Sequence, residues 1–183
     1  MPSVLIPLAQ GCEELEAVTV IDLLRRAGIE VVSAALDDQT VTGARGTRLL
    51  ADTTLDAALR RDYDMVVLPG GQPGADNLDQ DARIRVLLQR MSEQGKYTAA
   101  ICAAPKVLAS AGLLAGKHAT GFPGVLEKLN LQDVQLSNAP VVTDGKLITS
   151  RGPGTAMDFA LELIEVLAGK EKRAQVEVAL QRP

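Results

Sequence analysis

The feature that most constrains this fold is a regular alternation of short apolar runs with amphipathic segments along the 183 residues. The apolar runs are continuous rather than alternating, which is typical of parallel strands buried on both faces. Strands are predicted at residues 4–8, 30–35, 64–69, 98–102, 134–136, 141–143 and 147–150. Strands that alternate with helices predict a mainly parallel sheet with helices on both faces.

The segments between the strands carry helical periodicity and end at helix-stop residues. The segment 14–27 stops at Gly28 and the segment 82–94 stops at Gly95, as expected for helix C-termini. Further helices are predicted at residues 105–111, 154–168 and 171–180. Residues 40–51, with glycines inside an apolar run, predict a small β-hairpin. Without linkers or repeats, residues 1–183 are expected to form a single doubly wound α/β domain.

Composition excludes several function classes. A net charge of −4 and a pI near 5.1 offer no electrostatic footprint for nucleic acid or an anionic membrane. No apolar run approaches the roughly 18 residues that span a bilayer. Two cysteines make no disulfide framework, and the first residues show no signal peptide. We therefore expect a cytoplasmic protein without nucleic-acid or membrane partners.

Cys102 stands where α/β proteins place nucleophiles. It ends the apolar run 98–102, and a helix begins within three residues. The N–H groups of that helix would point back at the sulfur and favour a thiolate. The alternative is a small buried cysteine that fills space. Its place at the carboxyl edge of the predicted sheet, where ligands of such sheets bind, favours the reactive interpretation.

Other polar and glycine-rich segments are expected at the same edge. Glu16 follows the first strand and would be neutral beside a thiolate, because two anions in one pocket repel. Alternatively, Glu16 and the glutamates before it are simply charges favoured at a helix N-terminus. Gly70 and Gly71 could aim an N–H group at an oxyanion, or form an ordinary turn. The segment 151–155 could bind an anion, or Thr155 could cap the next helix.

These segments also resemble a known family. Gly11-Cys-Glu-Glu-Leu-Glu-Ala-Val, Val67-Leu-Pro-Gly-Gly-Gln-Pro-Gly-Ala, Ala99-Ala-Ile-Cys-Ala-Ala-Pro and Thr149-Ser-Arg-Gly-Pro-Gly-Thr resemble the ThiJ/PfpI superfamily. Within it, they are most similar to the branch of the parkinsonism-associated protein deglycase and its bacterial relatives. The resemblance covers essentially the whole chain.

The resemblance implies a flavodoxin-like fold, a homodimer and a set of site residues. Cys102 would be the reactive, oxidation-prone cysteine and Glu16 the protonated acid that hydrogen-bonds it. Gly71 and Ala103 would donate backbone N–H groups near the sulfur. Gly70 and Arg45 would contact substrate, Arg45 by reaching the pocket across the dimer. The helix at 171–180 would be the extra C-terminal helix of this branch.

The chain departs from the pattern at one informative place. Relatives often carry a histidine where Phe122 stands, and the single histidine, His118, is expected at the surface. The protease-like branch places a histidine after the nucleophile, where Ala103 stands here. A Cys–His protease is therefore disfavoured.

The predicted function is a cofactor-independent, cysteine-dependent enzyme of the glyoxalase III or protein deglycase type. Its substrates would be reactive 2-oxoaldehydes or their protein adducts, and neither a metal nor an organic cofactor is expected. The alternative is a redox-sensing stress-response protein or a chaperone with little turnover. Cys12 could be a resolving thiol, although a buried spacer is the better interpretation.

Overall fold

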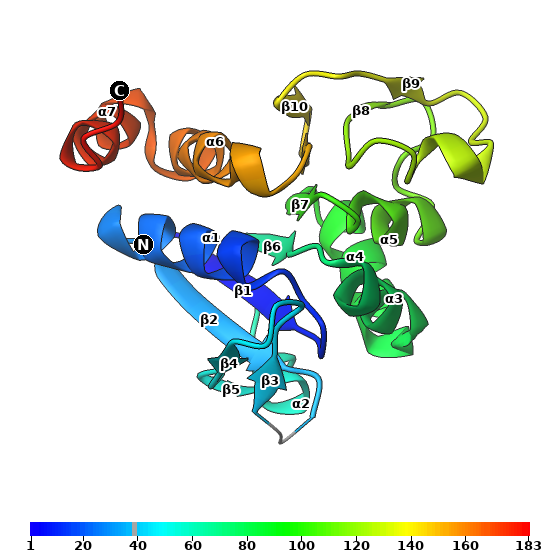
Figure 1. Ribbon diagram of the computed structural model, residues 1–183, viewed down its shortest axis with the longest axis horizontal. Helices are drawn as coiled ribbons and strands as arrows, with labels where there is room; N and C mark the ends of the chain where they lie inside the picture. Colours follow the sequence, from blue (N-terminus) through cyan, green and yellow to red (C-terminus); the bar gives the residue numbers. More distant parts are fainter. Residues whose placement is uncertain (38–39) are drawn as a thin grey trace.

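The computed structural model describes residues 1–37 and 40–183, and these build a seven-stranded sheet with the order β10-β11-β7-β6-β1-β2-β5 (Figure 1). Neighbouring strands run parallel except at β10 and β11, which pair antiparallel at one edge. The strands are β1 (Ser3–Leu8), β2 (Glu30–Ala35), β5 (Thr53–Thr54), β6 (Met65–Leu68), β7 (Tyr97–Ile101), β10 (Val141–Asp144) and β11 (Leu147–Ser150). The predicted mainly parallel sheet is confirmed.

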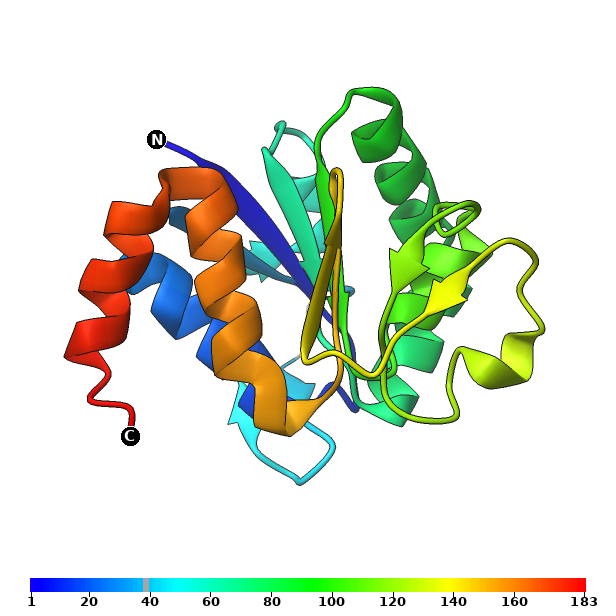
Figure 2. The ribbon, with the colours of Figure 1, turned by 90° about the horizontal axis from the view of Figure 1, so that it is seen from above.

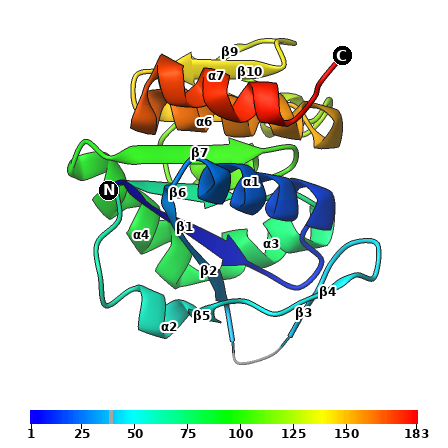
Figure 3. The ribbon, with the colours of Figure 1, turned by 90° about the vertical axis from the view of Figure 1, so that its left-hand side faces the viewer.

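Helices cover both faces of this sheet (Figure 2). One face carries α1 (Glu14–Arg26), α6 (Ala156–Ala168) and α7 (Lys170–Ala179), and α6 packs against both α1 and α7 (Figure 3). The other face carries α2 (Leu55–Ala58), α3 (Gln72–Gln80), α4 (Ala82–Glu93) and α5 (Pro105–Ser110). Each face has its own apolar core, because side chains of β1, β6 and β7 alternate between the two helical layers.

The position of α1 follows from its sequence. Glu14 and Glu16 lie in its first turn and Arg25 and Arg26 in its last, which suits the helix dipole. Gly28, with φ of 76°, reverses the chain into β2. The residues buried from this helix recur at helical spacing: Glu16, Ala17, Val20, Leu23 and Leu24. One of the five is a carboxylic acid, which is unusual for a core position.

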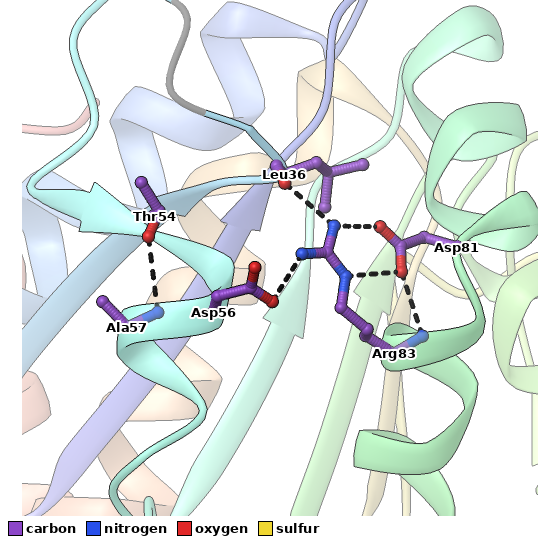
Figure 4. Close-up of polar contacts among 6 residues, drawn as sticks. All are labelled: Leu36, Thr54, Asp56, Ala57, Asp81 and Arg83. Carbon is purple, nitrogen blue, oxygen red and sulfur yellow. Dashed lines mark hydrogen bonds and ion pairs between the residues drawn. The ribbon is translucent and has the colours of Figure 1, made fainter.

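A cluster of ion pairs joins the second helical layer to the sheet (Figure 4). The guanidinium of Arg83 on α4 contacts the carboxylates of Asp81 and Asp56 at 2.6 and 2.7 Å. It also donates to the carbonyl oxygen of Leu36, just beyond β2, at 2.8 Å. Arg83 therefore ties the N-terminus of α4 to α2 and to the end of β2.

One local prediction is present in the structure, and two others need correction. The predicted hairpin is present as β3 (Val41–Thr42) paired antiparallel with β4 (Arg48–Leu49). α3 was not predicted, because Pro73 and Gly74 in its first turn are more typical of a loop. The run predicted at 134–136 lies outside the main sheet, as β9 (Gln135–Leu136) paired with β8 (His118–Ala119).

Smaller elements complete the chain. Short 3₁₀ turns lie at Glu127–Leu129 and Pro153–Thr155, the second leading directly into α6. Among the described residues, no helix is long and apolar enough to span a bilayer.

Candidate functional site

Cys102 occupies a strained turn between β7 and α5. Its φ of 64° lies in the left-handed region, which is uncommon for a residue with a side chain. Two hydrogen bonds hold this conformation: its amide donates to the carbonyl of Ser150 at 2.9 Å, and its carbonyl accepts from the amide of Phe122 at 2.8 Å. The residue keeps 8% of its surface exposed. Backbone strain of this kind is typical of functional sites.

Glu16 lies beside this turn and is completely buried. One carboxyl oxygen, Oε2, accepts the amide N–H of Gly70 at 2.8 Å. The other oxygen, Oε1, has no hydrogen-bond partner among the described residues. Because a buried carboxyl oxygen is normally hydrogen-bonded, Oε1 is available to the Cys102 thiol, with which Glu16 interacts.

Gly70 sits between the two side chains and has no room for a side chain of its own. A Cβ atom there would lie 2.6 Å from Cβ of Cys102 and 2.7 Å from Oε2 of Glu16. Gly71 follows with φ of 84°, and a Cβ on it would lie 2.5 Å from the carbonyl oxygen of Gly11. The glycine pair therefore lets the loop after β6 pack against both the cysteine and the start of α1.

Burial dominates the acid–base behaviour of the pair. It raises the pKa of Glu16 from 4.5 to about 7, against the opposing effect of the Gly70 amide. Burial, followed by the charge of Glu16, raises the pKa of the Cys102 thiol to about 12, although hydrogen bonds from the amides of Gly71 and Ala103 lower it. The backbone N–H groups therefore favour a thiolate, in the direction the sequence predicts, but burial and the neighbouring acid outweigh them.

The two groups behave as one acid. Because the pKa of the thiol is raised well above that of the carboxyl group, the pair loses its first proton near neutral pH and keeps the second, either on sulfur or on the carboxyl group. Transfer of that proton from Sγ to Glu16 creates a thiolate next to a neutral carboxylic acid without changing the net charge of the pocket. The amides of Gly71 and Ala103 then stabilise the sulfur anion.

Arg45 is not brought to this pair within one chain. It lies exposed at the tip of the β3–β4 hairpin, and its amide donates to the carboxylate of Glu14 at 2.9 Å. The same carboxylate accepts the amide of Thr47 at 3.2 Å. Glu14 therefore anchors the hairpin to α1, two residues before Glu16. The sequence suggested only that Glu14 was a charge at a helix terminus, since a contact 31 residues away leaves no local signal.

The remaining candidates divide as follows. His118 is exposed and pairs with Asp144 through Nδ1 at 3.3 Å, as expected for a surface histidine. Cys12 is fully buried, and burial raises its pKa to about 11, which fits a spacer rather than a resolving thiol. Thr155 precedes α6 as predicted, but its side chain makes no cap hydrogen bond to that helix; its Oγ1 accepts the amide of Gly152 at 3.1 Å. No group of three or more potential metal ligands occurs in residues 1–37 and 40–183.

These features define a class of α/β proteins with a nucleophile elbow. The sheet is mainly parallel, the cysteine lies on a strained strand-to-helix turn, and a buried acid lies beside it. Residues 2–166 match the model of the DJ-1/PfpI family. The chain belongs to the DJ-1/PfpI family. This confirms the resemblance found in the sequence.

Individual relatives support this assignment. The solved structure of DJ-1beta from Drosophila melanogaster superposes with a TM-score of 0.95 at 42% identity, covering 100% of this chain and 98% of that one. "Glutathione-independent glyoxalase DJR-1.2" of Caenorhabditis elegans is 34% identical over 92% of this chain and 89% of its own. "Protein DJ-1 homolog B" of Arabidopsis thaliana is 44% identical over 97% of this chain, which spans only 41% of that relative's length.

Proposed function

We propose that this protein is a cofactor-independent enzyme that converts reactive 2-oxoaldehydes, or their adducts on proteins, into 2-hydroxy acids. The observation that carries this proposal is the buried Glu16 with one carboxyl oxygen left for Cys102. A relative named as a glutathione-independent glyoxalase supports it. The same pair acting on a glycated amine or thiol amounts to deglycation.

The first step is addition of sulfur to the aldehyde. The thiol proton of Cys102 moves to the Glu16 carboxylate, and the thiolate attacks the aldehyde carbon C1. A C–S bond forms while the carbonyl electron pair moves onto oxygen, where the amides of Gly71 and Ala103 stabilise the charge. Glu16 returns the proton to this oxygen, which leaves a hemithioacetal.

The second step moves a hydrogen within the adduct. Glu16 removes the proton from C1 and returns it to C2, while the hydroxyl proton on the C1 oxygen moves to the C2 oxygen, so that C1 is oxidised and C2 is reduced in the same molecule. The product is a thioester of Cys102, and water hydrolyses it to a 2-hydroxy acid and the free thiol. One water is consumed and no external oxidant or reductant is needed. No histidine takes part.

The test measures lactate formed from methylglyoxal. Cys102→Ser is expected to lower the rate by about a hundredfold or more, because a hydroxyl is a far weaker nucleophile. Cys12→Ser is the matched control and is expected to keep the wild-type rate. Equal rates for wild type and Cys102→Ser would remove the cysteine from the mechanism.

A second function, redox sensing, is favoured by the same geometry. Peroxide would transfer two oxygen atoms to the Cys102 sulfur, releasing two waters, and protonated Glu16 would donate a hydrogen bond to the resulting sulfinate. Intact mass after mild peroxide treatment tests this. Two added oxygens in wild type and in Cys12→Ser, lost in Glu16→Leu, would support sensing; no mass gain would exclude it.

We further propose that the protein works as a homodimer in the cytoplasm. Leu15 and Val18 on α1 are 49% and 46% exposed, and Leu50 next to the hairpin is 87% exposed. An isologous contact through these side chains would bury them and would let Arg45 reach the partner's pocket. Size-exclusion chromatography with light scattering measures the molar mass in solution. A monomer at micromolar concentration would contradict the proposal.

A further inference from the structure

A shallow depression of about 280 Å³ lies beside the Cys102 turn and has no part in the chemistry described above. Phe122 and Pro123 form one wall, and residues 151–155 form the other. Backbone hydrogen bonds of Cys102 link it to both walls. The Phe122 amide donates to its carbonyl, and the Cys102 amide donates to the carbonyl of Ser150, the residue before Arg151. These bonds hold the two walls next to the backbone of Cys102.

The first wall is apolar and open. Phe122 is 49% exposed, whereas the other phenylalanine of the chain, Phe159, is completely buried. A Cβ atom on Gly152 would lie 3.4 Å from Cδ2 of the ring, so the glycine leaves the ring uncovered on that side. An exposed aromatic surface between two prolines favours contact with another flat apolar group.

The second wall supplies a positive charge. The half-buried Arg151 makes no ion pair with any residue in 1–37 or 40–183, and no acidic side chain lines the depression. The hydroxyl of Thr155 is already engaged by Gly152 and Ser150. The guanidinium of Arg151 therefore gives this depression a positive charge, although the chain as a whole carries a net charge of −4.

We propose that this depression binds the part of the substrate remote from the reacting carbonyl, and that it selects 2-oxoaldehydes whose side group is flat, apolar and ends in a carboxylate. The proposal rests on the proposed function and adds the substrate class. The ring of the side group would lie against Phe122, and its carboxylate would pair with Arg151.

The experiment compares three substrates: methylglyoxal, phenylglyoxal and 4-carboxyphenylglyoxal. Wild type is expected to prefer the carboxylated over the neutral aryl compound in kcat/KM. Arg151→Gln is expected to lower this ratio about three- to fivefold, the usual effect of a partly exposed ion pair, and Arg151→Lys is expected to retain most of it. Phe122→Ala is expected to lower kcat/KM for both aryl substrates about three- to tenfold relative to methylglyoxal.

Arg60→Gln, which removes an exposed arginine two residues after α2, is the matched control and is expected to keep the wild-type ratio. Thermal melting shows that each variant is folded. An unchanged ratio in Arg151→Gln, with methylglyoxal still turned over by wild type, would overturn the inference and leave the proposed function standing.

A second readout does not depend on turnover. Iodoacetate and iodoacetamide alkylate Cys102 by the same reaction and differ in charge. The rate ratio of iodoacetate to iodoacetamide is expected to fall about threefold in Arg151→Gln and to stay constant in Arg60→Gln. If wild type converts no 2-oxoaldehyde, the proposed function fails, and this ratio alone decides whether the depression attracts anions: a fall supports the site and no change overturns it.

Discussion

The buried carboxyl group of Glu16 makes the stability of this protein depend on pH in a way that one substitution isolates. Its pKa rises from 4.5 to about 7 on folding because the group is buried. The folded state therefore holds this proton more tightly than the unfolded chain does. Stability from this source is complete below pH 4.5 and is lost as the pH rises through 7.

The size of the effect follows from the shift. A difference between 4.5 and about 7 corresponds to about 3 kcal/mol of the free energy of unfolding. Glu16→Gln removes the titration while its amide oxygen still accepts the Gly70 N–H. Relative to wild type, the variant is expected to gain about 3 kcal/mol between pH 4.5 and 8.

Urea unfolding of both proteins under reducing conditions, at several pH values between 4.5 and 8, measures this difference. The carboxylates with lowered pKa, such as Asp52 and Asp81, titrate in both proteins and cancel. Glu93→Gln, at an exposed position on α4, controls for the loss of one carboxyl group. A difference between wild type and Glu16→Gln that stays flat with pH, or that favours wild type at pH 8, would refute the reasoning.

Three further predictions concern single residues. Gly70→Ala is expected to destabilise the protein by about 1–3 kcal/mol in urea unfolding and to slow Cys102 alkylation, because the new Cβ would lie 2.6 Å from Cβ of Cys102. Wild-type stability and alkylation rate would contradict this close contact. Cys12→Ser is expected to cost about 1–3 kcal/mol, since it buries a hydroxyl in an apolar core, and an unchanged melting temperature would argue against its burial. Arg83→Gln is expected to lower the free energy of unfolding by about 1–3 kcal/mol through loss of its charged hydrogen bonds, and no change would show that this cluster adds nothing.

Much of the fold could be predicted from periodicity and stop residues. The strands Glu30–Ala35 and Leu147–Ser150 have the predicted bounds, because continuous apolar runs between polar residues mark buried strands clearly. The helix α3 could not be predicted in this way. Pro73 fits the first turn, where an N–H would have no helical partner, and Gly74 lets the Cys12 loop pack closely against the helix. Such contacts between distant segments leave no local pattern.

The site shows the same division. The places of Cys102 after β7 and of Glu16 after β1, two strands separated by β6, could be predicted, since the carboxyl ends of parallel strands share one edge. Their ionisation could not. The sequence shows a helix after Cys102 but not the degree of burial, and burial is what raises both pKa values.

The central claim is that Cys102 and Glu16 share one proton, and the rate of Cys102 alkylation as a function of pH tests it most directly. In wild type the rate is expected to rise with an inflection near pH 7, where the pair loses its first proton. In Glu16→Gln no carboxylate can accept the thiol proton, so the rise is expected only above about pH 9, near the ordinary range of a buried thiol. The same inflection near pH 7 in both proteins would contradict the account.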